Sequence, residues 1–229
     1  MTTQGNAIIV AALMCAAIGL SAACGTSSAT ATSPSATAAG GRGSGGAGSN
    51  ARSGPASGGA SGTVASVSAS SFEMSTATGQ KVTVDQTSST TYQKGTSSTS
   101  SSAITAGEDV LVLGTTSGTT ITATQVIVQP AGAGPVTPAA VGVVPFQPGA
   151  PTTSKQVGQI PANYTEGSGT IVSGTTANKA TEAALAAYPG GVVDRVVQLS
   201  DGEYEVHNIG VNWPHHVFVD QQFNVVGAN

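Results

Sequence analysis

Large apolar side chains gather in three stretches of this 229-residue chain, near residues 7–20, 64–128 and 192–226. Only segments that contain such side chains can bury enough apolar surface to offset the conformational entropy lost on folding. The stretches between them consist mostly of Gly, Ala, Ser, Thr and Pro. The sequence therefore predicts an apolar N-terminal segment and two small folded units joined by linkers.

The charge content restricts the function. Charged residues make up 8% of the chain, against about 25% in a typical soluble domain. The formal net charge is −4. A coiled coil and a basic nucleic-acid-binding protein are both excluded by this composition, and we expect no nucleic-acid partner.

The N-terminal apolar stretch has the features of an export signal. Residues 7–23 carry no charge and end in small residues. Their length of 17 residues is the short limit for a membrane span. The run Leu20-Ser21-Ala22-Ala23-Cys24 resembles the lipobox of bacterial lipoproteins, in which the cysteine receives a diacylglyceryl group and becomes the new N-terminus. The resemblance implies a lipoprotein signal peptide at residues 1–24, lipidation of Cys24, and a protein anchored at the extracytoplasmic face of the bacterial cell membrane.

Two departures from the lipobox keep alternatives open. Leu20 lies four residues before the cysteine instead of three, and the segment before the apolar stretch contains no Lys or Arg. An ordinary secretory signal or an uncleaved anchor would also fit. The other cysteine, Cys15, lies inside the apolar stretch, so the part after Cys24 can form no internal disulfide and no thiolate metal site.

Two linkers are predicted from composition. Residues 25–61 are nearly all Gly, Ala, Ser or Thr and include no Val, Leu, Ile or aromatic residue. They are expected to form a flexible tether with a root-mean-square span of about 35 Å. Residues 130–166 hold seven of the eleven prolines and are expected to form a stiffer, extended and disordered linker.

Residues 62–129 are predicted to form a β-domain. Phe72 and Met74 alternate with polar neighbours, and so do Val82 and Val84. An alternation of period two with β-branched residues is typical of strands that are buried on one face. Five or six short strands and no helix are expected, which favours a small closed or nearly closed barrel.

Several segments of this β-domain carry a family resemblance. They are Gly62-Thr63-Val64, Phe72-Glu73-Met74, Gly79-Gln80-Lys81-Val82, Thr90-Thr91-Tyr92, Gly107–Gly114 and Thr120-Ile121-Thr122-Ala123. Their order resembles a family of small bacterial envelope domains of unknown function that are thought to be OB-like barrels. The resemblance implies a fold and an envelope setting but no activity.

Residues 167–229 are predicted to form an α+β domain. Thr175 or Thr176 can cap a helix whose Ala, Leu and Tyr stripe ends at a Pro-Gly-Gly sequence. Apolar runs then follow on both sides of Asp201-Gly202, which is a strong hairpin signal. One helix packed across an antiparallel sheet of three or four strands is expected.

This second unit also resembles a known family. The matching segments are Ala180, Ala184-Leu185, Tyr188-Pro189-Gly190, Val192-Val193, Gly202–Val206, Val217–Asp220 and Val225-Val226. Together they resemble the PepSY domain, which occurs in peptidase propeptides and envelope proteins and is thought to restrain peptidases or bind partners without being an enzyme. The closing turn at Gln221–Asn224 and the segment Trp213–His216 differ from the family pattern.

The candidate site residues lie in the second unit. His207, His215 and His216, with Asp220, could hold Zn²⁺ or Cu²⁺, although surface imidazoles in a turn are an alternative reading. Trp213 and Tyr204 are the candidate partner-binding residues, and a lid over the core is the alternative role for Trp213.

No catalytic motif and no cofactor-binding motif are present in the sequence. We therefore expect a mainly β protein with one helix, an OB-like barrel followed by a PepSY-like α+β domain. The expected function is non-catalytic binding of an envelope protein, for example a peptidase, at the membrane. The alternative functions are metal binding or sensing through the three histidines and, third, a passive spacer in the cell wall.

Overall fold

The structure is a computed structural model, and it describes residues 54–129 and 156–229. The predicted signal peptide, Cys24 and most of both linkers lie outside these residues. The described strands of the N-terminal part are β1 (Ala56–Val67), β2 (Ser71–Ser75), β3 (Lys81–Asp85), β4 (Thr91–Lys94), β5 (Ser97–Ser98), β6 (Asp109–Ser117) and β7 (Thr120–Val128). The C-terminal part contains β8 (Val157–Gly158), β9 (Thr170–Ile171), α1 (Gly174–Ala187), β10 (Val192–Gln198), β11 (Tyr204–Ile209), β12 (His216–Val219) and β13 (Val225–Ala228).

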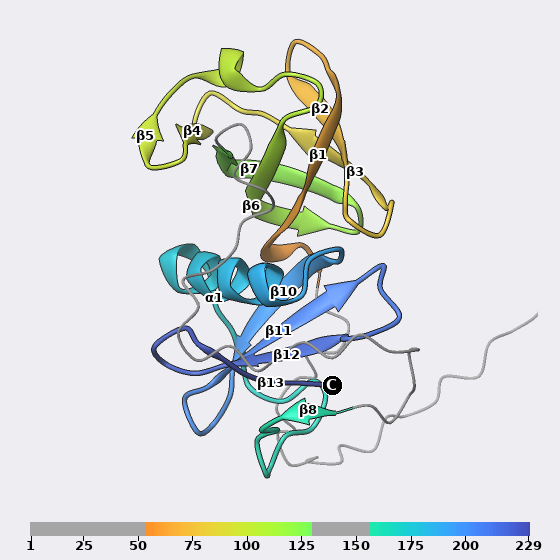
Figure 1. Ribbon diagram of the computed structural model, residues 1–229. Helices are drawn as coiled ribbons and strands as arrows, with labels where there is room; N and C mark the ends of the chain where they lie inside the picture. Colours follow the sequence, from red (N-terminus) through yellow and green to blue (C-terminus); the bar gives the residue numbers. More distant parts are fainter. Residues whose placement is uncertain (1–53, 130–155) are drawn as a thin grey trace, which may run out of the picture. The chain divides into compact units, whose positions relative to one another are not determined.

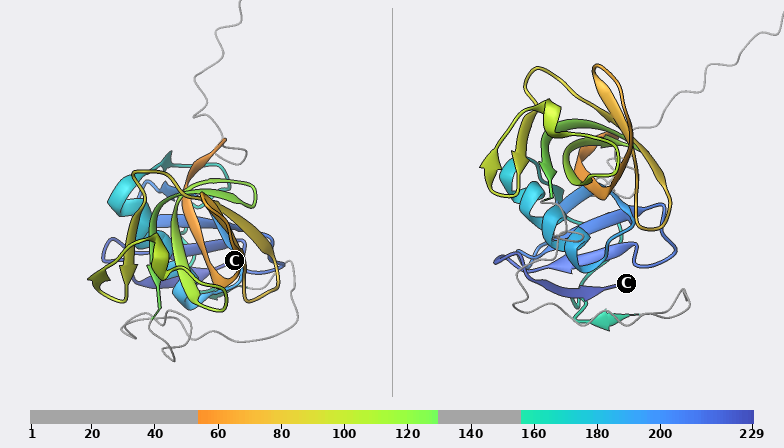
Figure 2. Two further views of the ribbon diagram at one scale, coloured as in Figure 1. Left: turned by 90° about the horizontal axis from the view of Figure 1, so that it is seen from above. Right: turned by 45° about the horizontal axis from the view of Figure 1, so that its top comes forward.

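Five strands of the N-terminal part close into a barrel (Figure 1). β1 pairs with β2 and with β6, β2 pairs with β3, β3 pairs in parallel with β7, and β7 pairs with β6. The right-hand view of Figure 2 shows how these strands curve around one another. The apolar residues of the predicted alternation, including Phe72, Met74, Val82 and Val84, fill the interior and are at most 1% exposed. The predicted mainly β fold with one helix and a small barrel is therefore confirmed.

The first strand begins inside the segment that the sequence assigns to the tether. β1 starts at Ala56, and the predicted boundary at residue 62 is wrong by six residues. The cause is close packing of strands: a Cβ atom at Gly58 would overlap the carbonyl oxygen of Val193, and one at Gly62 would overlap that of Ser75. The small residues that resemble a flexible tether are here what allows β1 to lie between its neighbours.

The C-terminal part has a helix on one face of an antiparallel sheet. The strand order is β10-β11-β12-β13-β8, with β9 on β10, and β1 of the barrel also pairs with β10. Ala177, Ala180, Ala184 and Leu185 of α1 are buried against this sheet. The predicted hairpin is present, with Gly202 in the turn at a φ of 91°.

Two details of this part differ from the sequence prediction. The helix begins at Gly174 with Ser173 as its N-cap, and neither Thr175 nor Thr176 caps it. The second predicted linker ends earlier than expected, because Val157–Gly158 already pairs with β13 and Ile160 packs on the sheet. In the described residues, no helix has the length and apolarity that crossing a bilayer requires.

Candidate metal site

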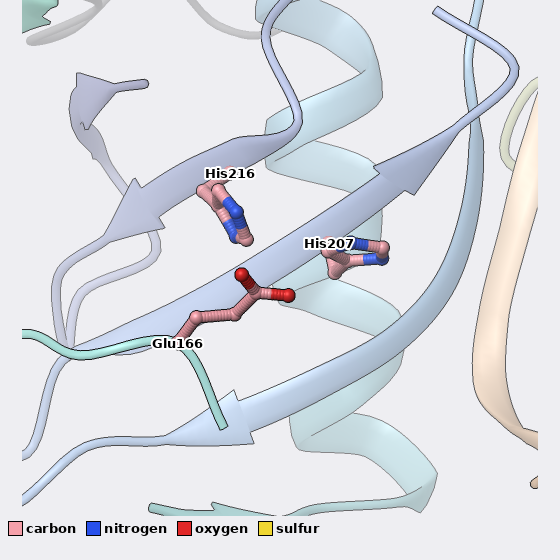
Figure 3. Close-up of side chains that lie close together, drawn as sticks. All are labelled: Glu166, His207 and His216. Atoms are coloured by element: carbon pink, nitrogen blue, oxygen red, sulfur yellow. The ribbon is translucent and has the colours of Figure 1, made fainter. Parts of the chain in front are cut away.

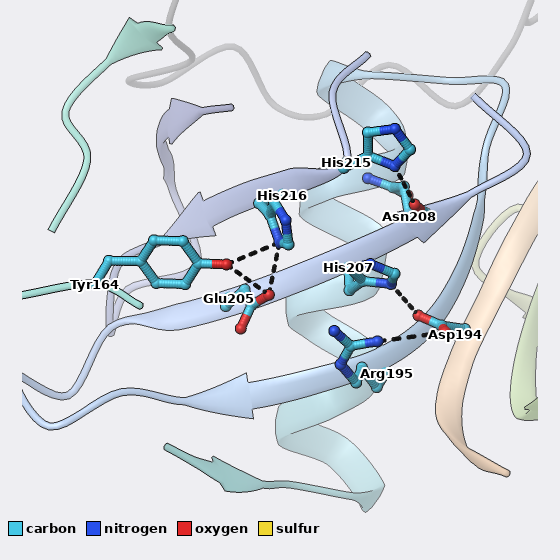
Figure 4. A network of polar contacts seen from close by, with 8 residues as sticks. All are labelled: Tyr164, Asp194, Arg195, Glu205, His207, Asn208, His215 and His216. Atoms are coloured by element: carbon cyan, nitrogen blue, oxygen red, sulfur yellow. Dashed lines mark hydrogen bonds and ion pairs between the residues drawn. The ribbon is translucent and has the colours of Figure 1, made fainter. Parts of the chain in front are cut away.

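Two of the predicted histidines face each other on neighbouring strands. His207 on β11 is the register partner of His216 on β12. Successive side chains on a strand point to opposite faces, and Val206 lies in the core beneath α1. His207 and His216 therefore lie on the sheet face away from α1, as Figure 4 shows.

Each of these imidazoles is held by a carboxylate. The Nδ1 atom of His207 lies 2.6 Å from Oδ1 of Asp194, and the Nδ1 atom of His216 lies 2.7 Å from Oε1 of Glu205. An ionised carboxylate can only accept, so Nδ1 is the donor in both pairs. Nε2 is then the nitrogen of each ring with a lone pair available for a metal ion, which is the arrangement typical of ligating histidines in proteins.

A tyrosine hydroxyl also contacts the pair formed by His216 and Glu205. The hydroxyl of Tyr164 lies 3.1 Å from Oε1 of Glu205 and 2.9 Å from Nδ1 of His216. Burial, and next the negative charge of Glu205, raise the pKa of Tyr164 far above its usual value, so the hydroxyl keeps its proton. The hydroxyl donates to Oε1 of Glu205, the same carboxylate oxygen that lies beside Nδ1 of His216.

Glu166 completes a cluster of three possible metal ligands. One ligand atom each from Glu166, His207 and His216 lies within 4.8 Å of the other two (Figure 3). Tetrahedral zinc with bonds of about 2.0–2.1 Å needs its ligand atoms about 3.4 Å apart. Each pair of ligand atoms must therefore approach by at most about 1.4 Å, and the side chain of Glu166 is exposed.

The charges around the cluster suit a divalent cation. Asp194, Glu205 and Glu166 contribute three carboxylates and Arg195 one guanidinium, which leaves two net negative charges when both imidazoles are neutral. Glu205 is 1% exposed and Arg195 is 2% exposed. Oε2 of Glu205 and Nε and Nη2 of Arg195 are buried and have no hydrogen-bond partner among the described residues. Such buried charges are costly unless another charge compensates them.

The cluster opens on a cavity of about 400 Å³. Asn212, Trp213 and His215 line this cavity together with the three cluster residues. An ion can therefore enter, and a further ligand can approach it from this side.

The third histidine does not belong to the cluster. His215 has an exposed side chain, its Nδ1 atom lies 3.3 Å from the carbonyl oxygen of Asn208, and its ring centre lies 6.5 Å from that of His207. Asp220 is used elsewhere, because its Oδ1 atom accepts the backbone N–H groups of Gln222 and Asn224 in the closing turn. Of the residues that the sequence proposes as metal ligands, the structure brings His207 and His216 together and leaves His215 and Asp220 outside this cluster.

Sequence reasoning missed Glu166, because it lies in the stretch assigned to the linker. Asp194 and Glu205 were also missed as partners of the histidines. The strand register pairs β11 with both β10 and β12, and this places them side by side. This register could not be predicted, because the pairing of β10 with β11 shifts between Val193 and Arg195. The sequence pattern predicts the strands but does not predict such a shift.

The two predicted partner-binding residues are largely enclosed. Tyr204 is 8% exposed and stacks on Phe223 with ring centres 5.7 Å apart, so it belongs to the core and does not offer its ring to a partner. Trp213 is half-buried and packs edge-on against Tyr188 at 5.5 Å. Its position fits the alternative role of a lid over the core.

Comparisons with known proteins give no family for this chain: no protein-family model matches it, and neither curated proteins nor solved structures match it significantly.

Proposed function

We propose that the C-terminal unit of this protein binds a divalent transition-metal ion, Zn²⁺ or Cu²⁺, through His207, His216 and Glu166. The observation that carries the proposal is the pair of facing imidazoles whose Nδ1 atoms are both bonded to carboxylates. This arrangement orients each ring and makes Nε2 the ligand atom before any ion binds.

The ligand types favour transition metals over calcium and magnesium. Mg²⁺ and Ca²⁺ prefer oxygen ligands, whereas imidazole suits Zn²⁺, Cu²⁺ and Ni²⁺. Two imidazoles and one carboxylate leave at least one coordination position for water or another ligand. The cavity beside the cluster has room for it.

The setting we propose is the extracytoplasmic face of a bacterial membrane. The lipobox-like sequence at Cys24 supports a lipid anchor, and the barrel and the helix-on-sheet arrangement support OB-like and PepSY-like modules. Neither module carries a catalytic motif, so the protein acts by binding.

The structure favours metal binding over the docking of an envelope peptidase as the role of this face. Trp213 and Tyr204 are the candidate partner-binding residues, and Trp213 is half-buried while Tyr204 belongs to the core. The metal site depends on contacts of 2.6–2.7 Å that are already formed.

A zinc titration in competition with a chromophoric chelator tests the proposal. The full chain is expected to bind one Zn²⁺ with a dissociation constant of about 1 µM or lower. His207→Ala and His216→Ala should each weaken binding by about a hundredfold or more, because each removes a ligand.

His215→Ala is the matched control, since it removes an imidazole of the same cavity that lies outside the cluster. It should change the affinity by no more than about threefold. Absence of zinc binding by the full chain, or His207→Ala and His216→Ala variants that bind like the wild type, would overturn the proposal.

A further inference from the structure

One segment, residues 159–169, lies on the sheet face away from α1, and we name it the strap. Ile160 and Tyr164 of the strap pack on Val197, Leu199 and Phe218. The ring of Tyr164 meets that of Phe218 edge-on, with centres 4.8 Å apart. The strap therefore covers an apolar patch that the helix does not cover.

The strap is weakly attached at both ends. Before it, β8 pairs with β13 at two positions, and the N–H of Gln159 donates to the carbonyl oxygen of Val226. After it, β9 pairs with β10 at two positions, and the N–H of Val172 donates to the carbonyl oxygen of Val196. Glycines with positive φ angles lie near both ends of the strap: Gly158 before it, and Gly167 and Gly169 at its end. Short segments with few buried contacts are those that open locally most easily.

Two side chains connect the strap to the polar groups of the sheet. Tyr164 does so through its hydroxyl, which donates to Glu205. Glu166 is the other, and its carboxylate belongs to the ligand cluster. The two histidines of that cluster lie on β11 and β12, so the candidate ligands come from both sides of the contact between strap and sheet (Figure 3).

We propose that a bound metal ion fastens the strap to the sheet, with Glu166 as the strap's ligand. This inference rests on the proposed metal site and adds a regulatory role to it. With the ion bound, opening of the strap must break the bond between Glu166 and the ion. Without the ion, the strap is held by the contacts of Tyr164 and Ile160, by the short strand pairs and by backbone hydrogen bonds such as that from the N–H of Gln159 to the carbonyl oxygen of Val226.

Linkage sets the size of the effect. The open form keeps the two histidines, so it still binds the ion, but without the carboxylate. A metal ion can therefore shift the equilibrium toward the closed form only by the ratio of its affinity for the closed form to its affinity for the open form. Loss of the exposed Glu166 carboxylate should cost less than loss of an imidazole and is expected to weaken binding by about ten- to a hundredfold, and the closed form should be favoured by the same factor. Opening of the strap would expose the patch of Val197, Leu199 and Phe218.

Hydrogen exchange of the full chain, with and without saturating Zn²⁺, tests the inference. Zinc should slow exchange of amides in residues 159–169 by about tenfold or more. Glu166→Ala should bind zinc more weakly, and when saturated it should show no such slowing. Glu182→Ala, which removes an exposed carboxylate from α1, is the matched control and should behave like the wild type.

The outcomes separate this inference from the proposed function. Zinc binding that leaves exchange of the strap unchanged would overturn the inference and leave the metal site standing. Equal slowing in saturated Glu166→Ala would overturn it too, because the ion would then act without the strap's ligand. A chain that binds no zinc would overturn both.

Discussion

At the scale of single residues, the hydrogen bonds to Nδ1 decide what His207 and His216 can do. A histidine pair alone is a weak sign of a metal site, since exposed imidazoles are common in turns. His207 and His216 differ from His215 in having a carboxylate at 2.6–2.7 Å that holds the ring. Of the three histidines, the sequence could name the candidates but could not separate these two from the third.

A substitution at Asp194 tests whether the carboxylate orients His207, and it leaves all three proposed ligands in place. Asp194→Asn keeps the size of the side chain but removes the charge that accepts from His207. Zinc affinity should fall by about ten- to a hundredfold, with the circular-dichroism spectrum unchanged. An affinity equal to that of the wild type would show that Asp194 does not orient the ring.

At the scale of elements, β1 shows how composition can mislead. Its first half has the same residue types as the tether, yet it pairs with β6 over eight register pairs from Ala56 to Thr63. Sequence patterns predict strands from large apolar residues in alternation, and this half-strand has none. Strands β2, β3, β6 and β7 were predictable because they do contain large apolar residues in alternation.

A pair of glycine substitutions tests the packing of β1. Gly62→Ala places a Cβ against the backbone carbonyl of Ser75, which cannot move without disturbing β2. The free energy of unfolding should fall by about 1–3 kcal/mol. Gly54→Ala is the control, because nothing lies within 4 Å of its Cβ position, and it should have little effect in the same urea titration. Equal stabilities for the two variants would contradict the close packing of this strand.

The hairpin turns at one end of the sheet carry a cluster of acidic groups. Burial, followed by the charges of Asp201 and Asp220, raises the pKa of Glu203 above its ordinary value of 4.5. Because the pKa of Glu203 is higher in the folded state, its protonated form favours folding. The stabilising effect of the proton is lost as the pH rises from about 4.5 through the folded-state pKa.

Glu203→Gln should therefore raise the thermal midpoint at pH 7, by about 1–3 °C because the side chain is partly exposed. At pH 4 the wild-type carboxyl is largely protonated, and the difference between variant and wild type should shrink to near zero. Thermal unfolding followed at both pH values measures this. A gain that is the same at pH 4 and pH 7 would show that charge is not its cause.

At the scale of the whole described molecule, the two predicted units are joined by strand pairing. β1 of the barrel pairs with β10 at Gly59↔Val193 and Ala60↔Val192. The hydroxyl of Thr78 also donates to the carbonyl oxygen of Gly190 at 2.6 Å. Each unit was predictable from its own pattern of strands and helix. Their connection was not, because it depends on backbone groups of small residues that carry no pattern.

In the candidate metal site, too, the local part could be predicted from the sequence and the long-range part could not. His207 and His216 are near in sequence and could be proposed from it, whereas Glu166 reaches them only because the strap folds back over the sheet. Contacts between segments far apart in the chain depend on register and on loop paths, which composition does not encode.

The most direct test of the central claim is X-ray absorption spectroscopy at the zinc edge of the full chain loaded with one equivalent of Zn²⁺. The proposed site predicts about two imidazole nitrogens and at least one oxygen at about 2.0–2.1 Å, without sulfur. His207→Ala should lose one imidazole contribution, and His215→Ala should lose none. A shell of oxygens alone, or an imidazole contribution lost with His215→Ala but kept with His207→Ala, would contradict the proposed site.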